Sequence, residues 1–100
     1  MKMIQDVYIK LKENMDIEKF YKKVKKSYED YPRVRFIFDT TGSSVSIGDM
    51  NKVKHVFDKL EDFTKLKLEE TCIIVDGDIK RTIINTFIQS IKQKKPVRII

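Results

Sequence analysis

The feature that most constrains the fold is an alternation of four short apolar segments with three longer segments whose apolar residues recur every three or four positions. The short segments span residues 7–12, 34–38, 71–75 and 97–100. Apolar runs of this length are typical of strands, and the longer spacing is typical of amphipathic helices. The sequence therefore predicts an α/β fold in the order β-α-β-α-β-α-β. Its four strands form a largely parallel sheet, and three helices provide right-handed crossovers.

The predicted strands differ in how their apolar residues are arranged. Residues 7–12 alternate apolar and polar side chains, which predicts a half-buried strand at the edge of the sheet. Residues 34–38 are almost continuous in β-branched and aromatic side chains, which predicts a strand covered on both faces. The third run, residues 71–75, is again short and apolar and predicts another buried strand.

The three helices are predicted from spacing and from the residues at their ends. The first spans residues 16–30 and ends there because Pro32 disfavours a helical conformation in the residue before it. The second spans about residues 49–68 with Asp49 as its N-cap, and the third has Asp78 as its N-cap. The apolar face of the third carries Ile79, Ile83, Ile84, Phe87, Ile88 and Ile91. This helix is the most apolar of the three, so we expect it to be the most buried.

Length and composition limit the class of protein. A chain of 100 residues with 41% hydrophobic residues builds one core, so we expect a single domain over residues 1–100. The one cysteine, Cys72, cannot form an intramolecular disulfide, and with the one histidine, His55, it cannot complete a zinc site. Neither a signal peptide nor a long apolar run is evident. We therefore expect a cytoplasmic protein without membrane insertion.

The net charge of +6 comes from the end of the chain. No acid follows Asp78, and the basic residues after it are Lys80, Arg81, Lys92, Lys94, Lys95 and Arg98. One interpretation is that Lys92, Lys94 and Lys95 bind nucleic acid, with a steep dependence on salt. The alternative is a solvated helix face, which we favour because no aromatic residues are interleaved with the lysines. Nucleic acid is therefore not the expected partner.

Polar side chains gather where the predicted strands end. The carboxyl ends of parallel strands lie at one edge of a sheet, and ligands of such sheets bind beyond that edge. The residues predicted to lie there are Asp39, Thr40, Thr41, Gly42, Ser43, Ser44, Asp76 and Asp78. This edge is therefore the candidate site.

Residues 37–43, Ile-Phe-Asp-Thr-Thr-Gly-Ser, resemble the nucleophile motif of haloacid-dehalogenase-like phosphatases. That resemblance implies that Asp39 is a nucleophile forming an aspartyl phosphate, and that Asp76 or Asp78 helps to hold magnesium at a site with Asp39. The chain has little room for the separate lysine motif and the cap of that family. Aspartate and glycine are also common in turns, so the alternative is that Asp39 ends a strand and Gly42 relieves a turn.

The order of elements from residue 7 to the C-terminus resembles a STAS domain, the fold of anti-sigma-factor antagonists, including the SpoIIAA-like proteins. The resemblance is carried by residues 9–11, 16–30, 34–38, the helix from Asp49, and residues 72–75, 79–91 and 95–100. It implies a non-enzymatic regulatory module that binds a protein partner and needs no cofactor. The sequence leaves open whether the chain forms a homo-oligomer.

STAS domains are switched by phosphorylation of a serine or threonine in a turn at the start of the helix after the central strand. The corresponding turn here, residues 47–50, is Ile-Gly-Asp-Met and has no hydroxyl; Asp49 supplies a fixed charge and Ser46 is the closest hydroxyl. We therefore expect a divergent STAS-like domain without the phosphorylation switch. Its predicted partner surface comprises Ser43, Ser44, Ser46, Gly48 and Asp49, with the exposed face of the helix that follows.

Overall fold

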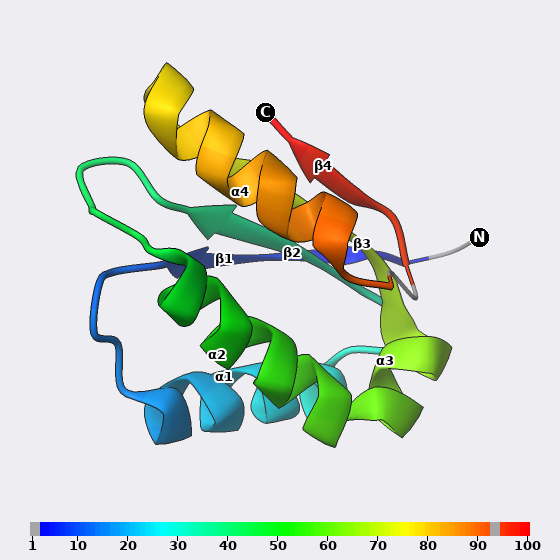
Figure 1. Ribbon diagram of the computed structural model, residues 1–100. Coiled ribbons are helices and arrows are strands. Elements are labelled where there is room, and N and C mark those ends of the chain that lie inside the picture. Colours follow the sequence, from blue (N-terminus) through cyan, green and yellow to red (C-terminus); the bar gives the residue numbers. More distant parts are fainter. Residues whose placement is uncertain (1–2, 93–94) are drawn as a thin grey trace.

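The computed structural model of the protein describes residues 3–92 and 95–100. Within that part of the chain it contains four strands and four helices (Figure 1). The strands are β1 (Gln5–Lys10), β2 (Val34–Asp39), β3 (Leu68–Ile74) and β4 (Val97–Ile99), and the helices are α1 (Ile17–Asp30), α2 (Ile47–Lys59), α3 (Glu61–Lys67) and α4 (Asp78–Ser90). The predicted α/β class and the alternation of strands with helical segments are confirmed, with four helices in place of three.

The additional helix arises because the predicted helix over residues 49–68 is broken at Leu60. This residue leaves the helical conformation, with φ −104° and ψ 29°, and its buried side chain packs into the core. Its N–H closes α2 on the Val56 carbonyl, and its own carbonyl accepts the first bond of α3 from Thr64 N–H at 2.9 Å. The turn directs α3 toward α1, where the Thr64 and Tyr28 hydroxyls lie 2.9 Å apart. The single-helix prediction was wrong because apolar spacing continues through the turn.

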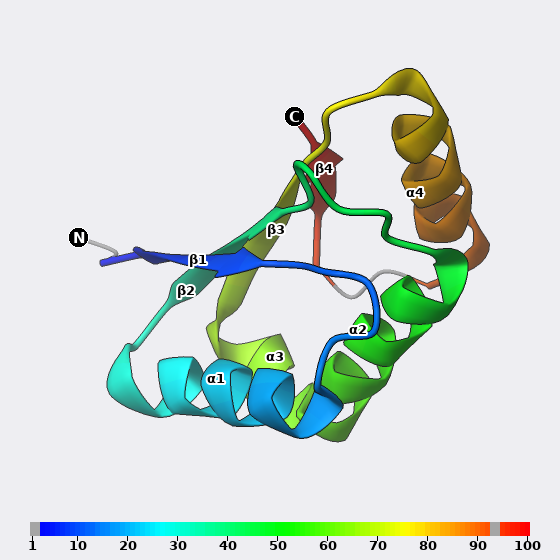
Figure 2. The ribbon, with the colours of Figure 1, turned by 90° about the vertical axis from the view of Figure 1, so that its left-hand side faces the viewer.

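The strands follow one another across the sheet in the order of the sequence. All three pairs of neighbouring strands are parallel, and the strands lie in sequence order β1-β2-β3-β4, so β1 is at an edge as predicted. All four helices lie on one face of this sheet (Figure 2), and no helix in the described residues covers the other face. None of these helices is both long enough and apolar enough to cross a membrane.

The core lies between the sheet and the helix layer, and its centre is aromatic. Phe36 and Phe38 of β2 are fully buried. The ring of Phe36 has its centroid 5.5 Å from that of Tyr28 in α1 and 5.7 Å from that of Phe57 in α2. Phe38 lies 5.7 Å from Phe20 of α1 in the same way. Such rings bury large apolar areas and prefer these tilted contacts, so β2 is the strand around which the helices close.

The uncovered face of the sheet carries a row of charged side chains, one from each strand. Arg35 of β2 donates from Nε to Asp6 Oδ1 of β1 at 2.8 Å and from Nη1 to Glu70 Oε1 of β3 at 3.2 Å. Arg98 of β4 donates from Nη2 to the same Glu70 oxygen at 3.0 Å. We call Asp6, Arg35, Glu70 and Arg98 the charge row. It joins all four strands on the face that lacks helices.

The apolar side chains of the uncovered face are buried by the sheet itself. Residues 34–38 predicted a strand covered on both faces, and helices cover only one of them. Ile37 points to the other face and is nevertheless buried, because its register neighbours Tyr8 and Cys72 stand on either side of it. The prediction of burial was right, and the expected cause was wrong.

Replacing Glu70 by glutamine is expected to weaken the charge row and to make the free energy of unfolding less dependent on pH in the acid range. Hydrogen bonds from Arg98, and next from Arg35, hold the pKa of the Glu70 carboxyl below its ordinary value. A lowered pKa adds stability that is fully present above the unfolded-state pKa of about 4.3 and is lost as the pH falls through the folded-state pKa. In urea unfolding at pH 7 we expect a loss of about 1–2 kcal/mol, and a smaller difference from wild type below about pH 4.

The matched control for this change is Glu29→Gln, because Glu29 is an exposed acid on α1. It should leave both the stability and its pH dependence near those of the wild type. If Glu70→Gln were as sensitive to acid as the wild type, the charge row would not contribute to the pH dependence.

The strands begin and end a few residues from where the sequence placed them. β1 covers Gln5–Lys10 in place of 7–12, and β3 begins at Leu68 in place of residue 71. The register between β2 and β3 shifts at the start of β3, so that Leu68 and Thr71 are both buried on the helix side although three residues apart. A shift of this kind interrupts the period of two on which strand prediction rests.

Candidate functional site

The loop over residues 40–46 lies at the edge of the sheet where β2 ends (Figure 1). Thr40 attaches the start of this loop to β3. Its N–H and its hydroxyl both donate to the Ile74 carbonyl, at 3.0 and 2.7 Å, and the residue is fully buried. Gly42 has φ +72°, a left-handed conformation that favours glycine. The first half of the loop is therefore fixed by the fold.

Asp39, the last residue of β2, orders the turn that follows it. Its Oδ1 accepts from the hydroxyl of Thr41 at 2.7 Å and from the backbone N–H of Thr41 at 2.8 Å. Lys10 Nζ at the end of β1 lies 3.7 Å from the same oxygen. These hydrogen bonds, the hydroxyl first, hold the pKa of Asp39 below its ordinary value. The carboxylate is ionised and engaged by its own chain, as the alternative of a strand end with a turn implied.

Asp76 ties the same loop to the start of α4. Its Oδ1 pairs with Lys80 Nζ at 2.6 Å, and its Oδ2 accepts from Gly42 N–H at 2.8 Å. Lys80 also donates to the Thr40 carbonyl at 2.6 Å. The bond from Lys80, and next that from Gly42, lowers the pKa of Asp76. The role of Lys80 was not predicted from the sequence, and the spacing of four residues between Asp76 and Lys80 was the available signal.

Asp78 does not act as predicted. The N-cap of α4 is Gly77, no side chain caps this helix, and Asp78 is the first helical residue. Asp39 and Asp76 both accept hydrogen bonds from the loop over residues 40–46, whereas Asp78 lies in the first turn of α4. The described residues contain no group of three His, Cys, Asp or Glu side chains that could hold a metal ion. The magnesium site of the phosphatase alternative is not assembled by these three carboxylates.

The edge also lacks the shape of an active site of a doubly wound sheet. In such sheets the ligand crevice forms where the strand order reverses and successive loops leave toward opposite faces. Here the order does not reverse, and the helices lie on one face (Figure 2). The strand order therefore provides no switch point at this edge of the described sheet.

Ser46 and Asp49 form a capping box at the start of α2. Ser46, not Asp49, is the N-cap, and its hydroxyl accepts from Asp49 N–H at 3.2 Å. The Asp49 carboxylate accepts from Ser46 N–H at 3.0 Å and from Asn14 N–H at 3.2 Å. Burial alone would raise the pKa of Asp49, but the bonds from Ser46 and Asn14 together outweigh burial and lower it.

Asp49 is therefore buried, and its assignment to the exposed partner surface was wrong. The physical reason is the inward turn of its carboxylate, which serves three donors of the chain. Ser44 and Gly48 are exposed and Ser43 is half-buried. Their backbone is also held, because Ser43 N–H donates to the Thr40 carbonyl at 3.2 Å and Ser44 N–H donates to Glu13 Oε2 at 2.8 Å.

Two exposed isoleucines at this edge were not predicted as site residues. Ile47 in the first turn of α2 is 50% exposed, and Ile79 in the first turn of α4 is 80% exposed. The loop over residues 40–46 runs between these two helix starts (Figure 1). Ile79 was expected on the buried face of the most buried helix, but α4 buries only Ile84, Phe87 and Ile88. We call this part of the edge the edge surface; it comprises the half-buried Ser43 and the exposed residues Ser44, Ser46, Ile47, Gly48 and Ile79.

The basic C-terminal residues do not form one face. Lys80 pairs with Asp76 at the edge of the sheet, and Arg98 belongs to the charge row on the uncovered face. Lys92 and Lys95 lie elsewhere, beside α4 and β4, and Lys94 is outside the described residues. Lys80 and Arg98 thus lie on other surfaces than Lys92 and Lys95, which line one pocket together.

Comparison with known proteins finds no relative of this chain. No protein-family model matches the chain, and no characterised protein and no solved structure shows a significant match.

Proposed function

We propose that this protein is a non-enzymatic, STAS-like module that binds a protein partner through the edge surface. The observation that carries the proposal is the exposure of Ile47 and Ile79 on either side of a loop whose backbone is already fixed. Exposed apolar side chains on a polar surface mark contact sites for other proteins. A rigid loop loses little conformational entropy on binding, which favours association.

The carboxylates of the edge support binding over catalysis. Asp39 and Asp76 are both ionised and both accept hydrogen bonds from the loop, so each has a structural task. A nucleophile needs room for its substrate and a neighbouring group that activates it. The described strands follow the order of the sequence, so the sheet has no point of reversed strand order where such a crevice forms.

The start of α2 supports binding without a phosphorylation switch. Ser46 is the hydroxyl nearest to the helix N-terminus, and it lies 3.0 Å from Asp49 Oδ2. A phosphate on Ser46 would meet the carboxylate of Asp49, and like charges repel. Asp49 already supplies the negative charge that the helix N-terminus favours. The surface is therefore proposed to be permanently competent for its partner.

We also propose a cytoplasmic location and self-association. Cys72 is a buried, unpaired thiol, which suits a reducing compartment. Strands β1 and β4 are both edges of the sheet within the described chain, and unpaired edges can add a strand from a second copy. Sedimentation equilibrium of the purified chain would measure its oligomeric state directly.

The double change Ile47→Asp and Ile79→Asp is expected to abolish partner binding while the fold is retained. Acidic residues suit the first turn of a helix, and both side chains are exposed, so stability should change by less than about 0.5 kcal/mol. Loss of two apolar anchors at the centre of an interface should weaken binding at least about tenfold. A photo-cross-linking residue at position 47 should give one defined adduct in cells, and affinity capture should recover the same protein.

The matched control is Leu66→Asp, because Leu66 is 72% exposed on α3, away from the edge surface. Capture that survives this change and fails in the double variant supports the proposal. Equal capture by the double variant and the wild type contradicts it. Magnesium-dependent hydrolysis of p-nitrophenyl phosphate that disappears in Asp39→Asn would also contradict it, in favour of the phosphatase alternative.

A further inference from the structure

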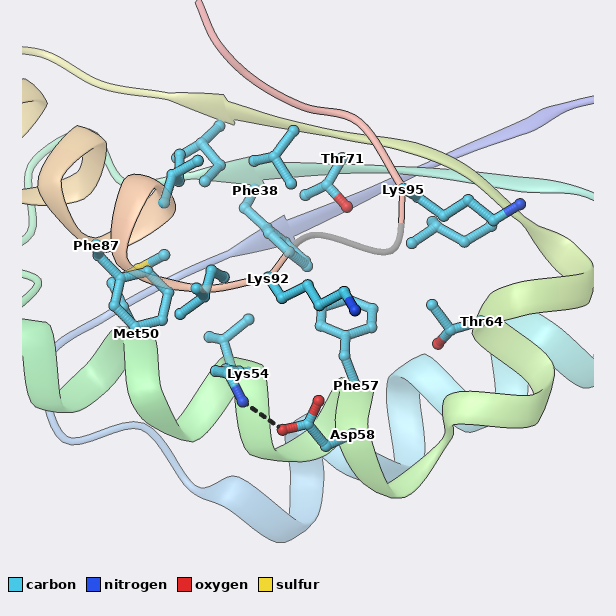
Figure 3. A pocket seen from close by; sticks show the side chains of 16 residues that line it. Phe38, Met50, Lys54, Phe57, Asp58, Thr64, Thr71, Phe87, Lys92 and Lys95 are labelled. Atoms are coloured by element: carbon cyan, nitrogen blue, oxygen red, sulfur yellow. Dashed lines mark hydrogen bonds and ion pairs between the residues drawn. The ribbon is translucent and has the colours of Figure 1, made fainter.

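A cavity of about 110 Å³ lies between α2, α4 and the sheet. Its apolar wall includes the rings of Phe38, Phe57 and Phe87 and the side chain of Met50, which point into the space in Figure 3. The cavity lies toward the starts of β3 and β4, where Leu68 and Val97 also line it, and no residue of the edge surface takes part. It is therefore a site separate from the proposed partner surface.

One polar side chain, Thr71, directs its hydroxyl into the cavity. Thr71 is 6% exposed, and its hydroxyl oxygen points into the space between Phe38 and Phe57 (Figure 3). Its backbone N–H donates to the Pro96 carbonyl at 3.0 Å, so β4 holds Thr71 at the wall of the cavity. Thr64, which lines the same cavity, has its hydroxyl paired with that of Tyr28. Because this hydroxyl of Thr71 faces the cavity, Thr71 offers a hydrogen-bond donor to a ligand that enters.

The rim of the cavity has an excess of positive charge. Lys54, Lys92 and Lys95 line it together with a single acid, Asp58. Lys54 and Asp58 pair with each other at 2.7 Å, which leaves Lys92 and Lys95 without an acidic partner in the described part of the chain. In Figure 3, Lys92 reaches across the opening in front of Phe57. The rim thus attracts an anion to a mouth that leads into an apolar interior.

We propose that this cavity binds a short-chain carboxylate, with its tail among the phenylalanine rings and its carboxylate held by Thr71 and Lys92. The tail is limited by size: an engineered cavity of about 150 Å³ accepts benzene, so this one accommodates about four carbons. The Thr71 hydroxyl donates to one carboxylate oxygen, and the Lys92 ammonium neutralises the charge at the mouth. Binding of a small molecule here is an activity additional to the proposed partner binding.

The test is a titration followed in two-dimensional amide NMR with three probes: pentanoate, pentan-1-ol, which lacks the charge, and acetate, which lacks the tail. Pentanoate should saturate in the millimolar range, as expected for so few atoms, and should shift the amide signals of residues that line the cavity. Each methylene removed should weaken binding about fourfold. Acetate and pentan-1-ol should each bind at least about tenfold more weakly than pentanoate.

Two variants separate recognition from packing. Thr71→Val keeps the shape and removes the donor, so pentanoate should bind about tenfold more weakly while the free protein melts at the same temperature or higher. Lys92→Met keeps the length and removes the charge, so it should weaken pentanoate but not pentan-1-ol. Lys25→Met, an exposed lysine on α1, controls for the change in net charge and should bind as the wild type does.

Pentanoate that fails to saturate at 298 K up to about 50 mM, well above the millimolar range, would overturn the proposal. Equal affinities for pentanoate and pentan-1-ol would also overturn it, as would wild-type affinity in both Thr71→Val and Lys92→Met. The edge surface is absent from this cavity, so Ile47→Asp with Ile79→Asp should leave pentanoate binding unchanged. Failure of one proposal is thereby distinguishable from failure of the other.

Discussion

Phe36→Ala is expected to lower the free energy of unfolding by about 3–5 kcal/mol, the largest effect of any single change considered for this protein. Phe36 is fully buried in the central part of the sheet, and its ring contacts those of Tyr28, Phe38 and Phe57. Alanine removes contacts to both α1 and α2 at once and leaves a cavity that the surrounding rings cannot fill. A domain of this size is stabilised by about 5–15 kcal/mol, so much of that stability disappears.

Thermal unfolding followed by circular dichroism checks this prediction. At about 4–8 °C per kcal/mol, the midpoint should fall by at least about 12 °C. The control is Tyr8→Ala, the same kind of truncation in β1, where the side chain is exposed on the uncovered face. It should change stability by less than about 1 kcal/mol. Similar losses in both variants would mean that the aromatic cluster is not the centre of the core.

Asp49→Ala is expected to destabilise the protein by about 2–3 kcal/mol, because it removes half of the capping box and leaves buried donors without an acceptor. The donors are the Ser46 N–H, the Ser46 hydroxyl and the Asn14 N–H. The pKa of Asp49 is lowered by the fold, so its contribution is full above the unfolded-state pKa of about 3.9 and is lost as the pH falls through the folded-state value. The difference between wild type and Asp49→Ala should therefore narrow below about pH 4.

Asp78→Ala is the matched control, because Asp78 is also an acid in the first turn of a helix but is exposed and does not cap it. It loses only its favourable interaction with the helix dipole, about 0.3–1 kcal/mol. Urea unfolding of both variants at pH 7 and at low pH measures the contrast. Equal effects at the two positions would refute the structural role assigned to Asp49.

Much of the fold could be predicted because the apolar pattern of each segment indicates its secondary structure and its buried face. The continuous run in residues 34–38 indicated a buried strand, and Phe36 and Phe38 form the centre of the core. Spacing of three or four residues located α1, whose buried residues include Phe20, Val24 and Tyr28. The break at Leu60 could not be predicted, since its side chain stays buried and so does not interrupt the apolar pattern.

The sequence predicted where the candidate site lies, but not which side chains are exposed there. Asp39 and Asp76 were expected at one edge, and they lie there because parallel strands end together. Which carboxylates remain available depends on partners far along the chain, such as Asn14 for Asp49 and Gly42 for Asp76. Ile79 was predicted to be buried because its spacing matches the apolar face of α4. It is exposed because it lies in the first turn of that helix.

The sequence by itself determined that strands alternate with amphipathic helices around one core, since hydrophobic periodicity is a local property of each segment. Only the tertiary structure decided that every helix lies on the same face and that a charge row joins the strands on the other. Strand order depends on contacts between residues far apart in the chain, such as Gln5 with Val34 and Thr71 with Val97, and no local pattern encodes it. The same contacts buried Asp49, exposed Ile47 and Ile79, and left the Thr71 hydroxyl facing an apolar cavity.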